Sequence, residues 1–78
     1  MTQNVTLRKS RTIGERIKAA RADAGLSITR LARELDVDPR TVARWQSDAV
    51  TPSVDRILKI AALTQKSPEF FFAEEVTA

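Results

Sequence analysis

The chain has 78 residues and a mass of 8.7 kDa, a length that allows one domain. It contains no cysteine and no histidine, which excludes disulfide bonds, thiol nucleophiles, imidazole bases and the usual zinc sites. Hydrophobic residues make up 42% and charged residues 29%. No apolar run approaches the ~18 residues of a membrane span, and no apolar leader follows Met1, so we expect a soluble, cytoplasmic protein.

The charges are distributed unevenly along the chain. Thirteen Lys and Arg against ten Asp and Glu give a net charge of +3 and an isoelectric point near 10.0. The first 21 residues contain one acid, Glu15, and six bases: Arg8, Lys9, Arg11, Arg16, Lys18 and Arg21. The last twelve contain three acids, Glu69, Glu74 and Glu75, and no base. This asymmetry favours a polyanionic partner for the front of the chain, although a solubilising surface explains the charge alone equally well.

Residues 1–11 lack acids and periodicity, which predicts a flexible basic arm, and one helical domain follows over residues 12–78. Thr12-Ile13-Gly14-Glu15 fits a capping box, in which the threonine and glutamate side chains bond the free amides of a helix start. The apolar positions of this first helix are Ile13, Ile17, Ala20 and Ala24. Gly25 supplies the left-handed residue that ends the helix.

Two short helices are expected next. Ser27 caps the first of them, which ends near Asp36 and has the apolar side Leu31, Ala32 and Leu35. The second of them begins with Asp38 as its cap and Pro39 as its first helical residue. Its inward-facing residues are expected to be Val42 and Trp45.

The remaining segments also have helical patterns. Ser53 caps a fourth helix directly after Pro52. Its main apolar stripe is expected to be Val54, Ile57, Leu58 and Ala61, with Ile60 and Leu63 partly outside it. Apolar residues on more than one face of this helix indicate that it is central in the fold or that one of its sides binds a partner. Ser67-Pro68-Glu69 starts a last turn containing Phe70–Phe72, and no strand pattern is found, so we predict an all-α fold of five short helices.

The connection between the second and third helices is the most informative feature. Only residues 36–38 separate them, a spacing that sets two helices at the steep angle of a helix-turn-helix. The outer side of the third helix then presents Arg40, Thr41 and Arg44. An arginine fork matches the O6/N7 edge of guanine, and a threonine methyl can contact a thymine methyl. The pattern predicts binding of double-stranded DNA; for the third helix alone, a solvated face is the alternative.

Residues 13–72 resemble the Cro and repressor type of helix-turn-helix domain of temperate phages and bacterial regulators. The resemblance lies in the stretches IGERIKAARADAGLS, LARELDVDPRTVARW and TPSVDRILKIAALTQKSPEFFF. It implies a compact five-helix, lambda-repressor-like domain that binds operator DNA, usually as a symmetric dimer with the third helix in the major groove. The implied base-contacting residues are Pro39, Arg40, Thr41 and Arg44. The implied backbone-contacting residues are Arg21, Ser27, Ile28, Thr29 and Ser47, to which the charge pattern adds Arg8, Lys9 and Arg11.

Four positions depart from the pattern of that family. Ile28 stands where a glutamine often bonds a phosphate, so only its backbone amide can serve there. Gln46 replaces a common glutamate, which predicts a neutral hydrogen bond to Arg21 in place of an ion pair and frees Arg21 for phosphate. Asp36 and Asp48 replace frequent glycines, which predicts left-handed backbone held at a steric cost.

The function predicted from these features is that of a phage or prophage Cro-like protein, or a minimal immunity repressor, in a bacterial host cell. No enzyme, cofactor, metal site or small-molecule ligand is expected, because Asp36 and Asp38 are explained by turn and cap chemistry. We expect a homodimer on DNA, with a monomer in solution as an alternative. The expected interface residues are Ile60, Leu63, Phe70, Phe71 and Phe72. The rival hypothesis is a protein-interaction module of antitoxin type, in which the fourth helix and the phenylalanines bind a protein partner.

Overall fold

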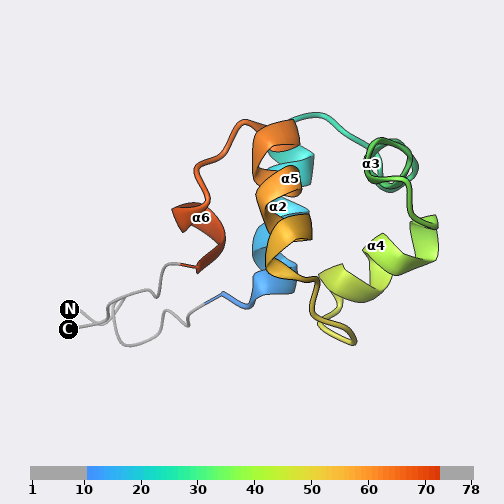
Figure 1. Ribbon diagram of the computed structural model, residues 1–78, viewed down its shortest axis with the longest axis horizontal. Coiled ribbons are helices and arrows are strands. Elements are labelled where there is room, and N and C mark those ends of the chain that lie inside the picture. The colour runs from blue at the N-terminus through green and yellow to red at the C-terminus, as the bar shows by residue number, and fades with distance from the viewer. Residues whose placement is uncertain (1–10, 73–78) are drawn as a thin grey trace, which may run out of the picture.

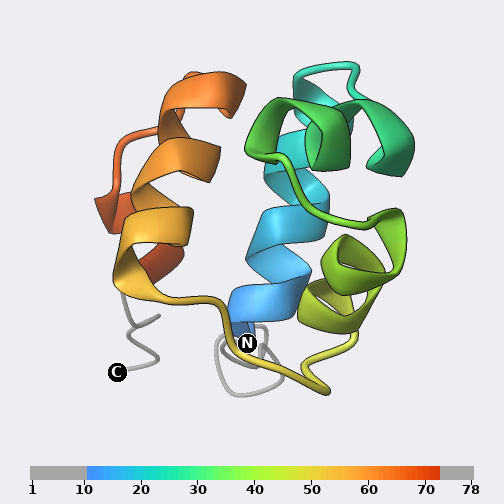
Figure 2. The ribbon, with the colours of Figure 1, turned by 45° about the vertical axis from the view of Figure 1, so that its right-hand side comes forward.

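The computed structural model describes residues 11–72, which form five helices and no strand. They are α2 (Ile13–Asp23), α3 (Ile28–Leu35), α4 (Pro39–Gln46), α5 (Val54–Thr64) and α6 (Glu69–Phe72). Helices α2 and α5 lie side by side, with α3 and α4 on one side of them and α6 on the other (Figures 1 and 2). The predicted all-α class and the five-helix architecture are confirmed. Of the predicted arm, only Arg11 lies within the described residues.

The starts of the helices follow the polar caps of the sequence. The amide of Glu15 donates to Oγ1 of Thr12 over 3.0 Å, and the amide of Thr12 donates to Oε1 of Glu15 over 3.0 Å, which completes the predicted capping box. Ser27, Asp38 and Ser53 accept a backbone amide at the starts of α3, α4 and α5, over 2.9, 2.8 and 3.2 Å. The predicted caps of all four long helices are therefore confirmed.

Helices α2, α3, α4 and α5 all end in the same way. After one residue of left-handed backbone, the next amide donates to the carbonyl five residues before it. Only α2 uses a glycine there, Gly25 at φ 73°, whereas the others use Asp36 (59°), Asp48 (66°) and Gln65 (60°). The left-handed geometry predicted for Asp36 and Asp48 is confirmed, and Gln65 is a further position that the sequence did not indicate.

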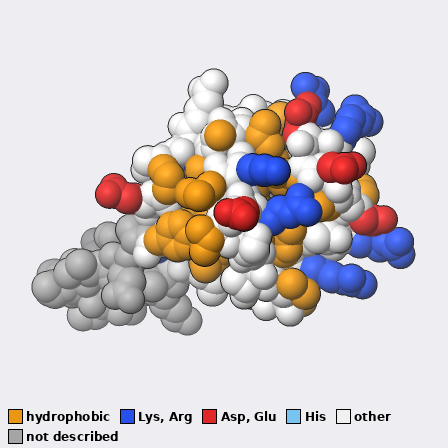
Figure 3. Space-filling model, viewed as in Figure 1, with side chains coloured by type: hydrophobic (Ala, Val, Ile, Leu, Met, Phe, Trp, Pro, Cys, Tyr) orange, Lys and Arg blue, Asp and Glu red, His pale blue; other side chains and the backbone are white. Residues whose placement is uncertain are grey.

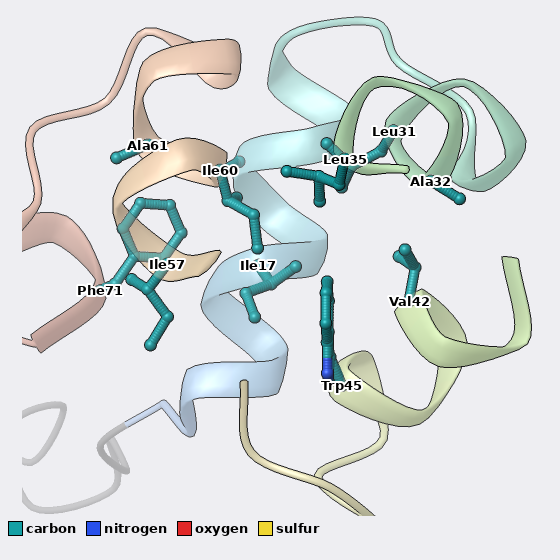
Figure 4. Close-up of a cluster of buried hydrophobic side chains, with 11 residues drawn as sticks. Ile17, Leu31, Ala32, Leu35, Val42, Trp45, Ile57, Ile60, Ala61 and Phe71 are labelled. Atoms are coloured by element: carbon teal, nitrogen blue, oxygen red, sulfur yellow. The ribbon is translucent and has the colours of Figure 1, made fainter. Parts of the chain in front are cut away.

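One hydrophobic core joins all five helices (Figure 4). It consists of Ile17, Ala20, Leu31, Ala32, Leu35, Val42, Trp45, Ile57, Ile60, Ala61 and Phe71. Each large apolar side chain that is fully buried contributes about 1.5–3 kcal/mol. Among residues 11–72, no helix has the length and apolar character needed to cross a membrane.

The expectations for α5 and α6 are wrong in two respects. Val54 and Leu58, placed in the main buried stripe, are 60% and 42% exposed, whereas Ile60 is fully buried. Phe71 is also in the core, so neither Ile60 nor Phe71 can form a dimer interface. The buried stripe lies instead on Ile57, Ile60, Ala61 and Thr64. It is turned this way because α5 packs against α2 and α3. The buried hydroxyl of Thr64 is satisfied within the helix, where it donates to the Ile60 carbonyl over 2.7 Å.

The start of α2 meets the end of α4 at Gly14. The amide of Gly14 donates to Oδ1 of Asp48 over 2.9 Å, so the residue after α4 helps to cap α2. A Cβ at Gly14 would lie 2.4 Å from the carbonyl oxygen of Trp45 and 2.6 Å from that of Gln46. Only glycine fits at this crossing, a role that sequence reasoning missed because it depends on a helix 30 residues away.

We expect Gly14→Ala to lower the free energy of unfolding by about 1–3 kcal/mol, since the added methyl overlaps backbone oxygens that cannot rotate away. The cost of the overlap should exceed the gain of about 1 kcal/mol that alanine brings over glycine in helix propensity. Urea unfolding followed by circular dichroism measures it. Gly25→Ala is the comparison, because its Cβ meets open space and should cost only about 1 kcal/mol of left-handed strain. An unchanged or higher urea midpoint for Gly14→Ala would contradict the close approach.

The two left-handed aspartates should respond in opposite ways to glycine. Asp36→Gly should raise the free energy of unfolding by up to about 1 kcal/mol, because it removes side-chain strain and a negative charge at the end of α3. Asp48→Gly relieves similar strain but removes the acceptor of the Gly14 amide, so it should lower the same quantity by about 1 kcal/mol. Paired urea titrations test this; changes of equal sign would refute the assigned role of Asp48.

Candidate nucleic-acid interface

Helices α3 and α4 form the corner expected from their short connection (Figure 2). The amide of Val37 donates to the carbonyl of Ala32 over 3.0 Å, which closes the turn. Ala32 is buried where the two helices approach, so its small side chain permits the close packing. From α5, Nη1 of Arg56 donates to the carbonyl of Leu35 over 2.7 Å and ties the corner to the rest of the domain. The outer sides of α3 and α4 are therefore held in a fixed relation.

The outer side of α4 is an exposed stripe with two arginines. Val42 and Trp45 are buried on the inner side, where they belong to the same core as Ile17 (Figure 4). The stripe consists of Arg40, Ala43, Arg44 and Ser47, and each of Ala43 and Arg44 lies three or four residues from Arg40 and from Ser47. Pro39 is exposed and Thr41 partly exposed, so all four residues expected to contact bases are accessible. Ala43 is a further exposed residue of this stripe that the sequence did not indicate.

The first turn of α3 opens on the same corner. Thr29 and Pro39 line one hollow of about 220 Å³ between the two helices. Ser27 and Thr29 are exposed and Ile28 is partly buried. Within residues 11–72, the amides of Ile28 and Thr29 have no acceptor, because Ser27 accepts from the amide of Arg30. Free amides at a helix start favour an anion such as phosphate.

Arg21 joins α2 to this surface. Its Nε donates to Oε1 of Gln46 over 2.7 Å, and its Nη1 donates to the carbonyl of Leu26 over 2.7 Å. The neutral hydrogen bond predicted from Gln46 is thus confirmed. Since guanidinium has five N–H donors, Arg21 keeps donors beyond these two and stands next to the start of α3.

Part of the basic charge of the sequence serves the fold and not this surface. Arg16 is buried, where its Nη1 donates to the carbonyl of Phe70 over 2.8 Å and its Nε to that of Arg11 over 3.2 Å. It therefore holds α6 against α2. Arg11 lines a hollow on the outer side of α2 with Glu15 and Lys18, and none of these contacts joins it to the corner. The expected backbone contacts Arg8 and Lys9 lie outside the described residues.

Asp38 and Arg40 form an ion pair at the start of α4. Oδ1 of Asp38 accepts from the backbone amide of Arg40 over 2.8 Å and from its Nε over 3.2 Å, and Nη2 of Arg40 lies 3.5 Å from Oδ2. The side-chain bond from Arg40, followed by the backbone bond, holds the pKa of Asp38 below its ordinary 3.8, and Asp38 raises the pKa of Arg40. The stabilisation of the fold by this ion pair is therefore present above pH 3.8 and is lost as the pH falls through the lowered pKa of Asp38. Sequence reasoning recognised Asp38 as a cap and missed the pair.

The comparisons with known proteins agree with this geometry. Residues 17–71 match the model of the helix-turn-helix family. The solution NMR structure of the DNA-binding domain of the P22 c2 repressor has a TM-score of 0.76 at 22% identity, covering 83% of this chain and 86% of that one. A crystal structure of the P22 c2 repressor in complex with a synthetic operator has a TM-score of 0.71 at 23% identity, covering 78% and 92%. No curated protein matches the sequence significantly. The chain shares the fold of these repressor domains.

Replacing the neutral partner of Arg21 tests the environment of that arginine. Gln46→Glu should create an ion pair over the existing 2.7 Å contact and raise the free energy of unfolding by about 0.5–1 kcal/mol at low salt. The gain should shrink as salt is added, because the pair is only partly buried. Thermal unfolding at two salt concentrations measures both effects. A gain that does not depend on salt would argue against a new ion pair.

Proposed function

Because the chain belongs to the helix-turn-helix family, we propose that it binds a specific operator in double-stranded DNA as a phage-type repressor. The coarser function, a DNA-binding regulator of transcription, follows from the family and points away from an enzyme. We propose a Cro-like protein or a minimal immunity repressor, acting in the cytoplasm of a bacterial host cell. The fold shared with the P22 c2 repressor supports the phage type.

The observation that carries this proposal is the arginine stripe on the outer side of α4. Arg40 and Arg44 lie one helical turn apart on a helix whose other side is anchored by Val42 and Trp45. A helix fits the major groove of B-DNA, where an arginine fork can pair with O6 and N7 of guanine. Thr41 and Pro39 complete the proposed base-contacting set, with the Thr41 methyl suited to a thymine methyl.

The start of α3 and the residues around it are suited to the DNA backbone. We propose that the amides of Ile28 and Thr29 and the hydroxyl of Ser27 meet one phosphate, with Arg21 close by. Ser47 lies at the end of α4, where its hydroxyl donates to the carbonyl of Arg44 over 3.1 Å. We propose it as the contact with the DNA backbone at that end of α4. Arg8, Lys9 and Arg11 remain proposed backbone contacts from the chain before α2.

We also propose that two copies bind one operator, through a surface that keeps Phe72 of the expected interface residues. Phe72 is 46% exposed, and Val54 and Leu58 present further apolar area on α5. Figure 3 shows hydrophobic side chains gathered over α6. Leu63 faces elsewhere, lining a hollow with Leu35 and Lys59 towards α3. Phe70 is partly buried against the core, with its ring centroid 5.2 Å from that of Phe71, so we propose Val54, Leu58 and Phe72 as the contact between copies.

Selection of bound sequences from a pool of random duplexes tests operator binding and dimerisation together. A repressor of this type should recover two copies of one half-site, their centres about 10 base pairs apart. Recovery of a single asymmetric half-site that one chain binds with full affinity would contradict the dimer. Recovery of no preferred sequence would contradict operator binding and favour the protein-interaction module, with the apolar side of α5 and α6 as its surface.

Arg44→Ala should cost about 1–3 kcal/mol of affinity for the selected duplex and relax the preference at one base pair, because one bidentate contact with a base is lost. Affinity for random duplex should change much less. The matched control is Lys59→Ala, which removes one exposed positive charge from α5. Fluorescence anisotropy titrations of both variants against both duplexes measure these effects. If Arg44→Ala weakens the two duplexes equally and leaves the preference intact, α4 does not read bases.

A further inference from the structure

The ion pair at the start of α4 has a geometry that bears on base recognition. The carboxylate of Asp38 faces the side edge of the Arg40 guanidinium, through Nε at 3.2 Å and Nη2 at 3.5 Å. A guanidinium has two edges that can make paired hydrogen bonds. Because Asp38 takes the side edge, the end edge, formed by Nη1 and Nη2, is left for another acceptor. The Arg40 side chain is 82% exposed, so this end edge is open.

Stability alone gives little reason for this pair. Exposed ion pairs contribute little or nothing to the stability of the fold. The carboxylate already caps α4 through the amide of Arg40, a task that an uncharged asparagine or serine performs equally well. What the charged pair adds is a defined position for a long side chain that is otherwise free to rotate. A long arginine side chain loses rotamer entropy when it is fixed, and one that is already ordered has less to lose on binding.

The charge of the pair also selects the kind of acceptor. Asp38 and Arg40 together are neutral, so Arg40 brings little net attraction to a phosphate while it is paired. A neutral pair suits an uncharged acceptor, and the O6 and N7 atoms of guanine match the spacing of the open end edge. Paired in this way, Arg40 is suited to a base edge, whereas an unpaired arginine can move to either a base or a phosphate.

We propose that Asp38 is a positioning residue for operator recognition, which holds the side edge of Arg40 and directs its end edge to one guanine. This inference rests on the proposed function and adds to it a residue with no contact to DNA. It assigns Asp38 a role in sequence preference that is separate from its role as a helix cap.

Asp38→Asn tests the proposal, because asparagine keeps the cap and removes the charge. Affinities are measured by anisotropy for the selected duplex, for the same duplex with the guanine read by Arg40 changed to adenine, and for random duplex at several salt concentrations. Arg40→Ala identifies that guanine, and it should reduce the preference for guanine over adenine at that position by about 5- to 150-fold. Asp38→Asn should reduce it by about 2- to 10-fold, the effect of leaving one flexible side chain to be ordered on binding.

The same variant should bind random duplex more tightly. Arg40, released from its partner, can then neutralise a phosphate, and the salt dependence should steepen by up to about 0.9 units. Glu34→Gln is the matched control, since it breaks the similar exposed pair of Arg30 and Glu34, 3.1 Å apart on α3. It should leave the guanine discrimination unchanged. Thermal unfolding of each variant verifies that the fold is kept.

Three results would overturn the proposal. If Asp38→Asn leaves discrimination and salt dependence unchanged, Asp38 acts only as a cap. If Asp38→Asn reduces base preference equally in the Arg40→Ala background, the carboxylate contacts a base by itself, as a cytosine amino group would allow. If Arg40→Ala changes the preference at no base pair while Arg44→Ala does, Arg40 contacts no base. Operator binding then stands without this inference. If the protein without any substitution shows no sequence preference, the proposed function itself is refuted.

Discussion

The burial of Val42 and Trp45 is the interaction on which the proposed DNA surface depends. Helix α4 has eight residues, and helices shorter than about 12–15 residues are marginal in water on their own. It persists because its inner side is part of the common core. The same anchoring decides which residues face outward, since a rotation of the helix that buried Arg44 would expose Trp45. Gly14 extends this constraint, because it lets the end of α4 approach α2 within van der Waals distance of bare backbone.

The charges of the domain divide into two groups with different tasks. Arg16 and Arg56 donate to backbone carbonyls and hold helices together, and their charge is largely used inside the fold. Arg44 lies outside, on a helix that ends two residues later, and is suited to an external acceptor. Net charge alone therefore says little about binding in so small a domain. The position of each arginine relative to the core determines whether it stabilises the protein or is available to a partner.

Local features of the structure could be predicted from the sequence, and long-range ones could not. The caps at Thr12, Ser27, Asp38 and Ser53 and the left-handed aspartates depend on neighbouring residues, so residue type and spacing determine them. The buried side of α5 depends on where α2 and α3 lie, and a helix with apolar residues on several faces leaves that choice open. The burial of Ile60 and Phe71 and the close approach at Gly14 likewise depend on helices that are distant in the sequence, so local patterns do not indicate them.

The first turn of α3 and the outer side of α4 form the proposed DNA-binding surface, on which the whole account depends. Titration of isotope-labelled protein with a duplex carrying one half-site, followed by amide chemical shifts, tests it without a second copy on the DNA. The amides of Thr29, Thr41 and Arg44 should shift most, because they lie on that surface, while that of Ala62 on α5 should shift least. Large shifts confined to α5 and α6, with α4 unchanged, would contradict the claim.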